Sequence, residues 1–294
     1  MLKNNQVISE VFMSIEGEAK YSGHPTVYIR YAGCNFKCAG FNNPNNEVDK
    51  NGYAPLKFVP ADITSINNMP TIEMGCDSQY AVNPAFSHLW EHLTVDQLLE
   101  RLMQTIPHNK WVNPITNNKY ILSLTGGEPT LRWKTIIDLL NHDGMRDVNH
   151  ILIETNCAVP LKDQFIQELS SWSEKRNGKI TWSNSPKLSV SGEPQEKAIR
   201  PEIAVKQLNV INSEQYFKFV CDDTVESFEE VKRIMNIYYQ QGVQRENNIY
   251  IMPMSCTEQQ QTNIMRNVAD LCIQYGFIYC HRIHNTVYEN QVGK

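Results

Sequence analysis

The chain has 294 residues, a formal net charge of -5 and a sequence pI near 5.9, and its lysines and arginines form no block. Because a surface that binds nucleic acid concentrates positive charge, this composition argues against nucleic acid as the main partner. The chain also lacks a membrane-spanning apolar run and the apolar core of a signal peptide, and eight cysteines are too sparse for a disulfide scaffold, so we expect a cytoplasmic protein with reduced thiols.

Two short strands open the predicted order of elements. Residues 7–12 alternate weakly between apolar and polar side chains, and residues 26–31 form a β-rich run. Residues 39–75 then lose this patterning in an asparagine-rich stretch with scattered prolines. Because such a long loop is unusual inside a compact domain, we interpret residues 39–75 as an insertion.

Strands and helices alternate along the rest of the chain. Thr94 and Gln97 form a candidate capping box before a helix. The predicted strands lie at 120–125, 150–154, 180–184, 215–220, 248–252 and 277–284, and the predicted helices at 131–140, 160–172 (with a proline in its first turn), 202–208, 227–241 and 258–275. This alternation predicts an α/β fold in one domain, residues 1–294, whose sheet is a partial (β/α) barrel of about six parallel strands. The functional face of such a barrel lies at the C-terminal ends of its strands.

Two cysteines, Cys34 and Cys38, follow the strand at residues 26–31. Cysteine sulfur is a soft ligand, and a loop can direct several thiolates toward one iron-sulfur cluster. A four-iron cluster that also activates a small molecule needs three protein thiolates and one open iron. Phe41 occupies the position where a closely spaced third cysteine would stand, so the pair alone does not make a site.

Polar residues also follow the later strands. The sequence Gly126-Gly127-Glu128 follows one strand, and its glycines let backbone approach a ligand while its carboxylate can accept hydrogen bonds from an ammonium group. Glu154 and Ser185 lie just after the next two strands. The simpler interpretation of the glycine motif alone is a strand-to-helix turn with a charged cap.

The order of these motifs resembles the radical S-adenosylmethionine superfamily, and the full set resembles the 7-carboxy-7-deazaguanine synthase family of queuosine-type deazapurine biosynthesis. The similar segments are Ser14 to Glu18, Ile29-Arg30, Ala32 to Asn35, Gly126 to Pro129, Glu154 to Asn156, Ser185 to Lys187, Lys218, Met252-Pro253 and Arg282 to His284. In that family three cysteines follow a C-x3-C-x2-C spacing, and Asp and then Thr or Ser follow the third.

Cys76-Asp77-Ser78 reproduces the end of this signature about thirty-five residues late. The resemblance therefore implies that residues 39–75 are inserted between the second and third cluster ligands, at an entropic cost of roughly 1 to 2 kcal/mol. The alternative is that Cys76 is an ordinary loop thiol and the cluster site is degenerate.

The resemblance implies a [4Fe-4S] cluster on Cys34, Cys38 and Cys76, with S-adenosylmethionine on the open iron and cleaved to a 5′-deoxyadenosyl radical. It also implies a reaction that converts 6-carboxy-5,6,7,8-tetrahydropterin to 7-carboxy-7-deazaguanine with loss of ammonia, an electron donor such as flavodoxin, and a homodimer. No catalytic residue is assigned beyond the ligands of cofactor and substrate. The implied contacts are Gly126, Gly127, Glu128, Glu154 and Ser185 for S-adenosylmethionine, Glu18, Arg30, Lys187 and His284 for the substrate, and Ser78 for Mg²⁺.

Two other functions stay open. A radical-activating enzyme of the same superfamily would act on a protein partner instead of a pterin. His88, Glu91 and His92 match the H-x-x-E-H pattern of zinc metalloproteases, although Pro84 and the cap at Thr94 leave little room for the long helix that such sites need. A non-catalytic zinc module anchored by cysteines is a variant of this second alternative.

Overall fold

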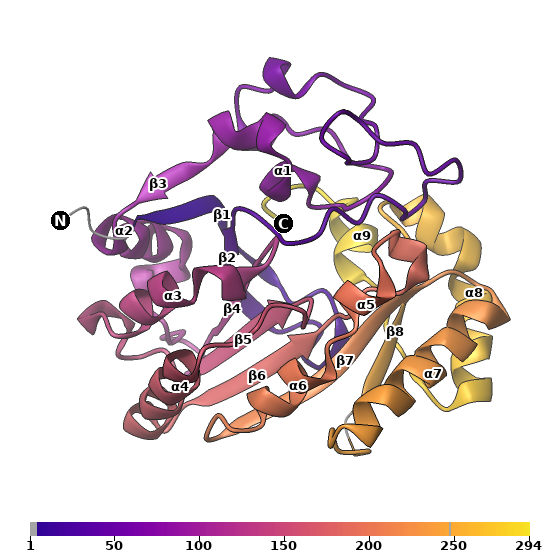
Figure 1. The fold of residues 1–294 in the computed structure, drawn as a ribbon. Helices are drawn as coiled ribbons and strands as arrows, with labels where there is room; N and C mark the ends of the chain where they lie inside the picture. Colours follow the sequence, from indigo (N-terminus) through magenta and orange to yellow (C-terminus); the bar gives the residue numbers. More distant parts are fainter. Residues whose placement is uncertain (1–4, 247) are drawn as a thin grey trace.

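The computed structural model describes residues 5–246 and 248–294. Within these residues one nine-stranded sheet runs in the order β3-β1-β2-β4-β5-β6-β7-β8-β9 (Figure 1). Strand β1 pairs antiparallel with β2 and β3, and the pairs from β2 to β9 are parallel. The strands span Gln6–Ile15 (β1), Pro25–Tyr31 (β2), Glu91–Leu93 (β3), Ile121–Gly126 (β4), His150–Thr155 (β5), Lys179–Asn184 (β6), Ser213–Cys221 (β7), Ile249–Pro253 (β8) and Ile278–Tyr279 (β9).

The mostly parallel sheet confirms the α/β class and corrects the expected number of strands. Seven of the strands described are parallel, where about six were expected. The sheet also has an antiparallel edge, because the first three residues of β1 pair with the short strand β3. Residues 91–93 carry no strand pattern of their own, so this edge depends on tertiary pairing.

The longer helices lie on the outer side of the sheet (Figure 1). Helix α2 begins at the predicted capping box, in which Gln97 N donates to Thr94 Oγ1 at 3.2 Å and Thr94 N donates to Gln97 Oε1 at 2.9 Å. No helix in the described part of the chain is long and apolar enough to cross a membrane. The α-helices span Gln79–Val82 (α1), Val95–Thr105 (α2), Trp133–Leu140 (α3), Asp163–Arg176 (α4), Gln195–Ala198 (α5), Pro201–Gln207 (α6), Val225–Gln240 (α7), Glu258–Tyr275 (α8) and Ile283–Tyr288 (α9).

Two predicted elements have different ends in the structure. Helix α4 begins at Asp163, so Pro160 precedes the helix instead of occupying its first turn. The strand expected at 277–284 is reduced to Ile278–Tyr279, and residues 283–288 form helix α9. Cys280 N still donates a hydrogen bond to Ile251 O of β8. The chain then leaves the sheet, because Ile283 N donates to Gly17 O, which lies outside the sheet.

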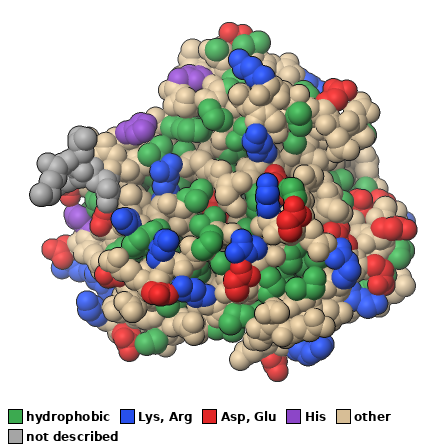
Figure 2. Space-filling view, in the orientation of Figure 1, with side chains coloured by type: hydrophobic (Ala, Val, Ile, Leu, Met, Phe, Trp, Pro, Cys, Tyr) green, Lys and Arg blue, Asp and Glu red, His purple; other side chains and the backbone are tan. Residues whose placement is uncertain are grey.

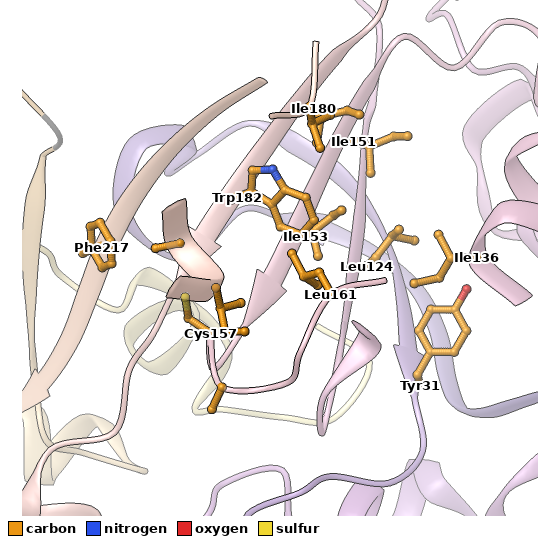
Figure 3. Packing of buried hydrophobic residues seen from close by; sticks show 14 of the residues in the cluster. Tyr31, Leu124, Ile136, Ile151, Ile153, Cys157, Leu161, Ile180, Trp182 and Phe217 are labelled. Carbon is orange, nitrogen blue, oxygen red and sulfur yellow. The ribbon is translucent and has the colours of Figure 1, made fainter. Parts of the chain in front are cut away.

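The main core lies between the parallel strands and the helices. Figure 3 shows Leu124, Ile153 and Trp182 from neighbouring strands packed in one buried cluster, with Ile136 of α3 beside Leu124. Cys157, a thiol outside the predicted ligand set that lies just after β5, belongs to this cluster and is fully buried. It therefore packs as a core residue.

The insertion at 39–75 crosses over the C-terminal ends of the strands (Figure 1). It is irregular apart from two 3-10 turns, Pro60–Asp62 and Ile66–Asn68. Its Tyr53 and Ile72 pack in a second hydrophobic cluster with residues from and near α1. On the other side Gln260 of α8 donates from Nε2 to Glu73 O at 3.1 Å. The insertion therefore connects α1 with α8 above the sheet.

Positive and negative side chains are interspersed on the face of the molecule that Figure 2 shows. Lysine and arginine alternate with aspartate and glutamate there, and hydrophobic side chains occur singly or in small groups. This mixture agrees with the weakly negative net charge of -5.

Candidate active site

A cavity opens at the C-terminal ends of the parallel strands, under the insertion. Its walls come from β1, β2, β4, β5, β7 and β8 and from the loop after β6, and the C-terminal residues 290–294 also reach it. All but one of the residues predicted to bind cluster, cofactor, substrate or Mg²⁺ line this cavity. They are Glu18, Arg30, Cys34, Cys38, Cys76, Ser78, Gly126, Gly127, Glu154, Ser185, Lys187 and His284.

The three predicted cluster cysteines lie in the same cavity although the insertion separates them in sequence. Burial raises the pKa of Cys34 to about 12 and that of Cys76 to about 11, and it raises the pKa of Cys38 well above its ordinary value. These raised pKa values mean that the free thiols resist ionisation. A bound metal overcomes this resistance, because it binds the thiolate form. All three cysteines line one cavity and are the soft donors that an iron-sulfur cluster binds. Among the residues that the structure describes, however, they are not assembled into a group of three or more side chains that could hold a metal ion.

Gly126 and Gly127 place the end of β4 directly against the cysteine loop. Gly126 has φ +138°, and a Cβ atom there would lie 2.2 Å from Tyr31 O. A Cβ atom on Gly127 would lie 2.2 Å from Gly33 O, one residue before Cys34. Both glycines are thus required by close packing of two backbones, and this packing joins the two predicted motifs in space.

Lys218 of β7 is the centre of a buried ion-pair network. Its Nζ lies 2.7 Å from Glu18 Oε2 and 2.8 Å from Glu154 Oε2, and Arg282 Nε lies 3.0 Å from Glu18 Oε1. Although burial opposes ionisation, Lys218 and Arg282 together hold the pKa of Glu18 well below its ordinary value. Arg282 also pairs with Asp77, which follows the predicted third ligand. The network therefore links both ends of the chain to the cysteine site.

Two further titratable groups line the cavity beside this network. Burial and the nearby Glu154 raise the pKa of Glu16 to about 8, and Glu16 Oε2 accepts a hydrogen bond from Tyr28 at 3.0 Å. Burial and Arg282 lower the pKa of His284 to about 4, so this imidazole is neutral at neutral pH. His284 is one of the predicted substrate residues, whereas no role is predicted for Glu16 from the sequence.

Arg30, a predicted substrate residue, is already paired in the structure. Its Nε lies 3.0 Å from Glu10 Oε2, and its guanidinium lies over the rings of Phe12 and Tyr80 at 5.6 and 5.7 Å from the ring centroids. Arg30 Nη1 also donates to Ser78 Oγ at 3.3 Å. This pairing makes Arg30 part of a structural ion pair near the end of β2, while the contact with Ser78 keeps it at the edge of the predicted Mg²⁺ site.

Sequence comparison finds relatives that cover most of the chain. A 7-carboxy-7-deazaguanine synthase of Methanopyrus kandleri is 26% identical over 255 residues, which cover 85% of this chain and 82% of the relative. The synthase of Clostridium acetobutylicum is 23% identical over 85% of this chain and 82% of its own length, and that of Rhodopirellula baltica is 25% identical over 99% and 90%. The chain is related to the 7-carboxy-7-deazaguanine synthases.

The solved structure of QueE from Escherichia coli has a similar fold. It superposes with a TM-score of 0.54 over 95% of both chains, at 16% sequence identity. No protein-family model matches the chain. The relationship to the synthases therefore rests on similarity along the whole chain, and it confirms the resemblance that the ordered motifs indicate.

Glu128 is the predicted residue of the synthase motif that does not line the cavity. Its carboxylate is fully buried and accepts hydrogen bonds from Thr130 N, Thr130 Oγ1, Thr155 Oγ1 and Asn156 N, at 2.5 to 3.1 Å. Glu128 therefore lies outside the cavity lining, and its contact with a ligand ammonium group stays a prediction. Glu128 ties the turn after β4 to the end of β5 and positions both.

The H-x-x-E-H segment is not one helix, although a zinc metalloprotease needs a helix there. His88 lies in the 3-10 helix Pro84–Leu89, whereas Glu91 and His92 lie in strand β3. His88 Nε2 lies 2.9 Å from Ile63 O of the insertion, and Glu91 pairs with Arg101. Because the two histidines are not one helical turn apart, the metalloprotease alternative is wrong.

Lys218, which the sequence leaves open between a core residue and a cofactor contact, and Arg282, which has no predicted role, are the main further residues of the site. Lys218 is a charged residue inside the apolar run of β7, and both residues belong to segments that resemble the synthases. A lysine in a buried strand needs a counter-charge, so its place in an apolar run could have predicted a buried ion pair. Which carboxylates supply it depends on the fold, because Glu18 and Glu154 lie far away in sequence.

Proposed function

We propose that the chain is a radical S-adenosylmethionine lyase that converts 6-carboxy-5,6,7,8-tetrahydropterin to 7-carboxy-7-deazaguanine with loss of ammonia. The observation that carries this proposal is the convergence of Cys34, Cys38 and Cys76 with the glycine turn and a charged network in one cavity. The whole-chain similarity to the synthases supports the same reaction.

The cysteines would hold a [4Fe-4S] cluster, because they supply three soft donors in one cavity and leave one iron for S-adenosylmethionine. When bound, these two groups supply the one-electron chemistry that activates the substrate. Backbone groups of Gly126 and Gly127 would take the methionine end of the cofactor, since they border the cysteine loop. Glu154 and Ser185 would contact the ribose or the carboxylate.

Lys187 is better placed than Arg30 to bind the substrate carboxylate. Lys187 Nζ donates to Ser185 Oγ, a neutral partner, at 3.3 Å, whereas Arg30 already pairs with Glu10. Glu18 and the neutral His284 would then meet the polar edge of the ring system. Ser78 and the adjacent Asp77 offer oxygen ligands of the kind that Mg²⁺ prefers.

The covered cavity fits a small molecule better than a protein substrate. Phe41 and Ile72 of the insertion line it from one side, and Val292 lines it from the C-terminal end. An enzyme that activates a partner protein has to admit a polypeptide segment. We therefore favour the pterin reaction over the radical-activating alternative.

Several properties enter the proposal from the sequence pattern or from the resemblance and not from the structure. They are closure of the sheet into a partial barrel, a single domain over residues 1–294, a homodimer, a cytoplasmic location and a flavodoxin-type electron donor. Sedimentation of the purified chain would test the dimer directly.

The deciding experiment is an anaerobic assay with the carboxylated pterin, S-adenosylmethionine, Mg²⁺ and a reductant, followed by mass detection of the product. We expect a product with the mass of 7-carboxy-7-deazaguanine. A chain that carries its full cluster and cleaves S-adenosylmethionine, yet forms no such product, would refute the pterin reaction and favour the protein-radical alternative.

A further inference from the structure

The loop after β6 lies against the cysteine loop and holds its backbone. Glu193 Oε1 accepts a hydrogen bond from Lys37 N at 2.7 Å and another from Cys38 N at 2.8 Å. Next to them, Gly40 N donates to Ser191 O at 2.9 Å. A Cβ atom on Gly40 would lie 2.7 Å from Val190 O, so the two loops are in direct backbone contact.

Two consecutive amides that point at one oxygen form an anion-binding nest. The N–H groups of Lys37 and Cys38 both donate to the same oxygen, and Cys38 itself has φ +49°, in the left-handed region. Nests of this kind hold anions at many phosphate and iron-sulfur sites. Here a side chain of the protein occupies the nest, so these two amides are directed at Glu193.

The carboxylate is itself held by a fixed loop. Glu193 N donates to Ser191 Oγ at 3.2 Å, and Ser191 Oγ donates to Leu188 O at 2.6 Å. Ser189 Oγ in turn donates to Glu230 Oε2 of α7 at 2.6 Å. Helix α7 therefore anchors the loop, and Glu193 reaches Cys38 from a rigid support.

We propose that Glu193 is a positioning residue that fixes Cys38 and lowers the reduction potential of the cluster on Cys34, Cys38 and Cys76, an inference that rests on the proposed function. Reduction adds one electron, supplied by the external donor, to a cluster that already carries negative charge. A carboxylate beside one ligand opposes that step, and two amides held by the carboxylate are withheld from the cluster sulfurs. Net charge and hydrogen bonds to sulfur are the main determinants of such potentials.

The test is a redox titration of the reconstituted cluster, in which electron paramagnetic resonance measures the reduced fraction at each potential. Glu193→Gln keeps an oxygen that can accept both N–H bonds and removes the charge. We expect the midpoint potential to shift to a more positive value while iron content stays at the wild-type level. Glu196→Gln is the matched control, because Glu196 is an exposed carboxylate of α5 in the same loop region, and it should leave the midpoint unchanged.

A second variant tests the positioning role. Glu193→Ala removes the acceptor as well as the charge, so we expect a positive shift together with faster loss of iron to a chelator. An unchanged midpoint in Glu193→Gln with a full cluster, or an equal shift in Glu196→Gln, would overturn the role of Glu193 and leave the proposed function standing. A wild-type chain that takes up no cluster would overturn both.

Discussion

Lys218 is a buried cation with two carboxylate partners at the site. Its side chain is only 6% exposed and faces two carboxylates, Glu18 and Glu154. Burying an ion is costly unless its charge is compensated, so each member of this set depends on the others. The arrangement keeps charged groups at fixed positions around the cavity before any ligand binds.

Lys218→Met should therefore destabilise the chain even without cofactors. The substitution keeps the volume but leaves the carboxylate of Glu154 without its buried counter-charge, and we expect a loss of roughly 3 to 5 kcal/mol in the free energy of unfolding. Denaturant titration of the apoprotein measures it. Lys57→Met is the control, because Lys57 pairs with Glu73 at 70% exposure and should change the stability by less than about 1 kcal/mol. Equal effects of both substitutions would contradict this account.

Glu16 gives the site a predicted pH dependence. Its pKa is raised from 4.5 to about 8 in the folded chain by burial and by Glu154, so between these values the folded state binds a proton that the unfolded state has lost. Stability must then fall as pH rises through this window. Glu16→Gln stays neutral, and its stability relative to wild type should rise with pH by up to about 1.4 kcal/mol per pH unit. Unfolding titrations at several pH values between these limits measure this slope, and a difference that does not vary with pH would exclude the raised pKa.

At this scale the chemistry of single residues was largely predictable and their pairing was not. Cysteine, glycine and carboxylate motifs carry their chemistry in the residue type, and most of the predicted residues line the cavity. Glu128 lies outside the cavity lining because four hydrogen-bond donors from its own turn and from the end of β5 satisfy its carboxylate. Sequence order does not show such competition.

The contact between the turn after β4 and the cysteine loop after β2 is the central packing of elements. β2 and β4 pair in parallel up to Tyr31 and Gly126, so both loops emerge at the same edge of the sheet. Glycine at 126 and 127 allows the two backbones to touch. Any added side chain must push the cysteine loop away.

Gly127→Ala should accordingly disturb the cluster site. Its Cβ atom would meet Gly33 O at 2.2 Å, a backbone atom that cannot rotate away, so we expect roughly 1 to 3 kcal/mol of destabilisation and reduced iron uptake. Gly23→Ala is a useful comparison, because its Cβ atom would meet no atom within 4 Å and the cost is confined to its positive φ of +87°. Iron analysis of both variants after reconstitution would measure the difference. Equal iron content in the two would contradict the role of this packing.

Elements with strong periodicity were predicted well, and elements that depend on neighbours were not. Helix α8 and its end at Gly276 follow from the pattern and the glycine cap. The predicted end of the last strand, at residue 284, was wrong because Ile283 N donates to Gly17 O, a partner from the start of the chain. Strand β3 was missed because its three residues gain their strand conformation only by pairing with β1.

On the scale of the whole molecule, the site joins the turn after β1, the N-cap of α9 and the residue that follows the insertion. Glu18, Arg282 and Cys76 come from these three regions and meet around one cavity. The β/α alternation predicted that the site would lie at the C-terminal ends of the parallel strands. It could not predict that the insertion spans from α1 to α8, because residues 39–75 carry no periodic pattern and their path follows from side-chain contacts such as that of Gln260 with Glu73.

The iron and sulfide content after anaerobic reconstitution tests most directly the claim that the insertion returns a third ligand to Cys34 and Cys38. Wild type and Cys272→Ala, which removes a buried thiol of α8, should each hold about four irons with a sulfide-to-iron charge-transfer band. Cys76→Ala should lose the intact cluster. Full retention of the cluster in Cys76→Ala, or zinc in place of iron in the wild type, would contradict the claim.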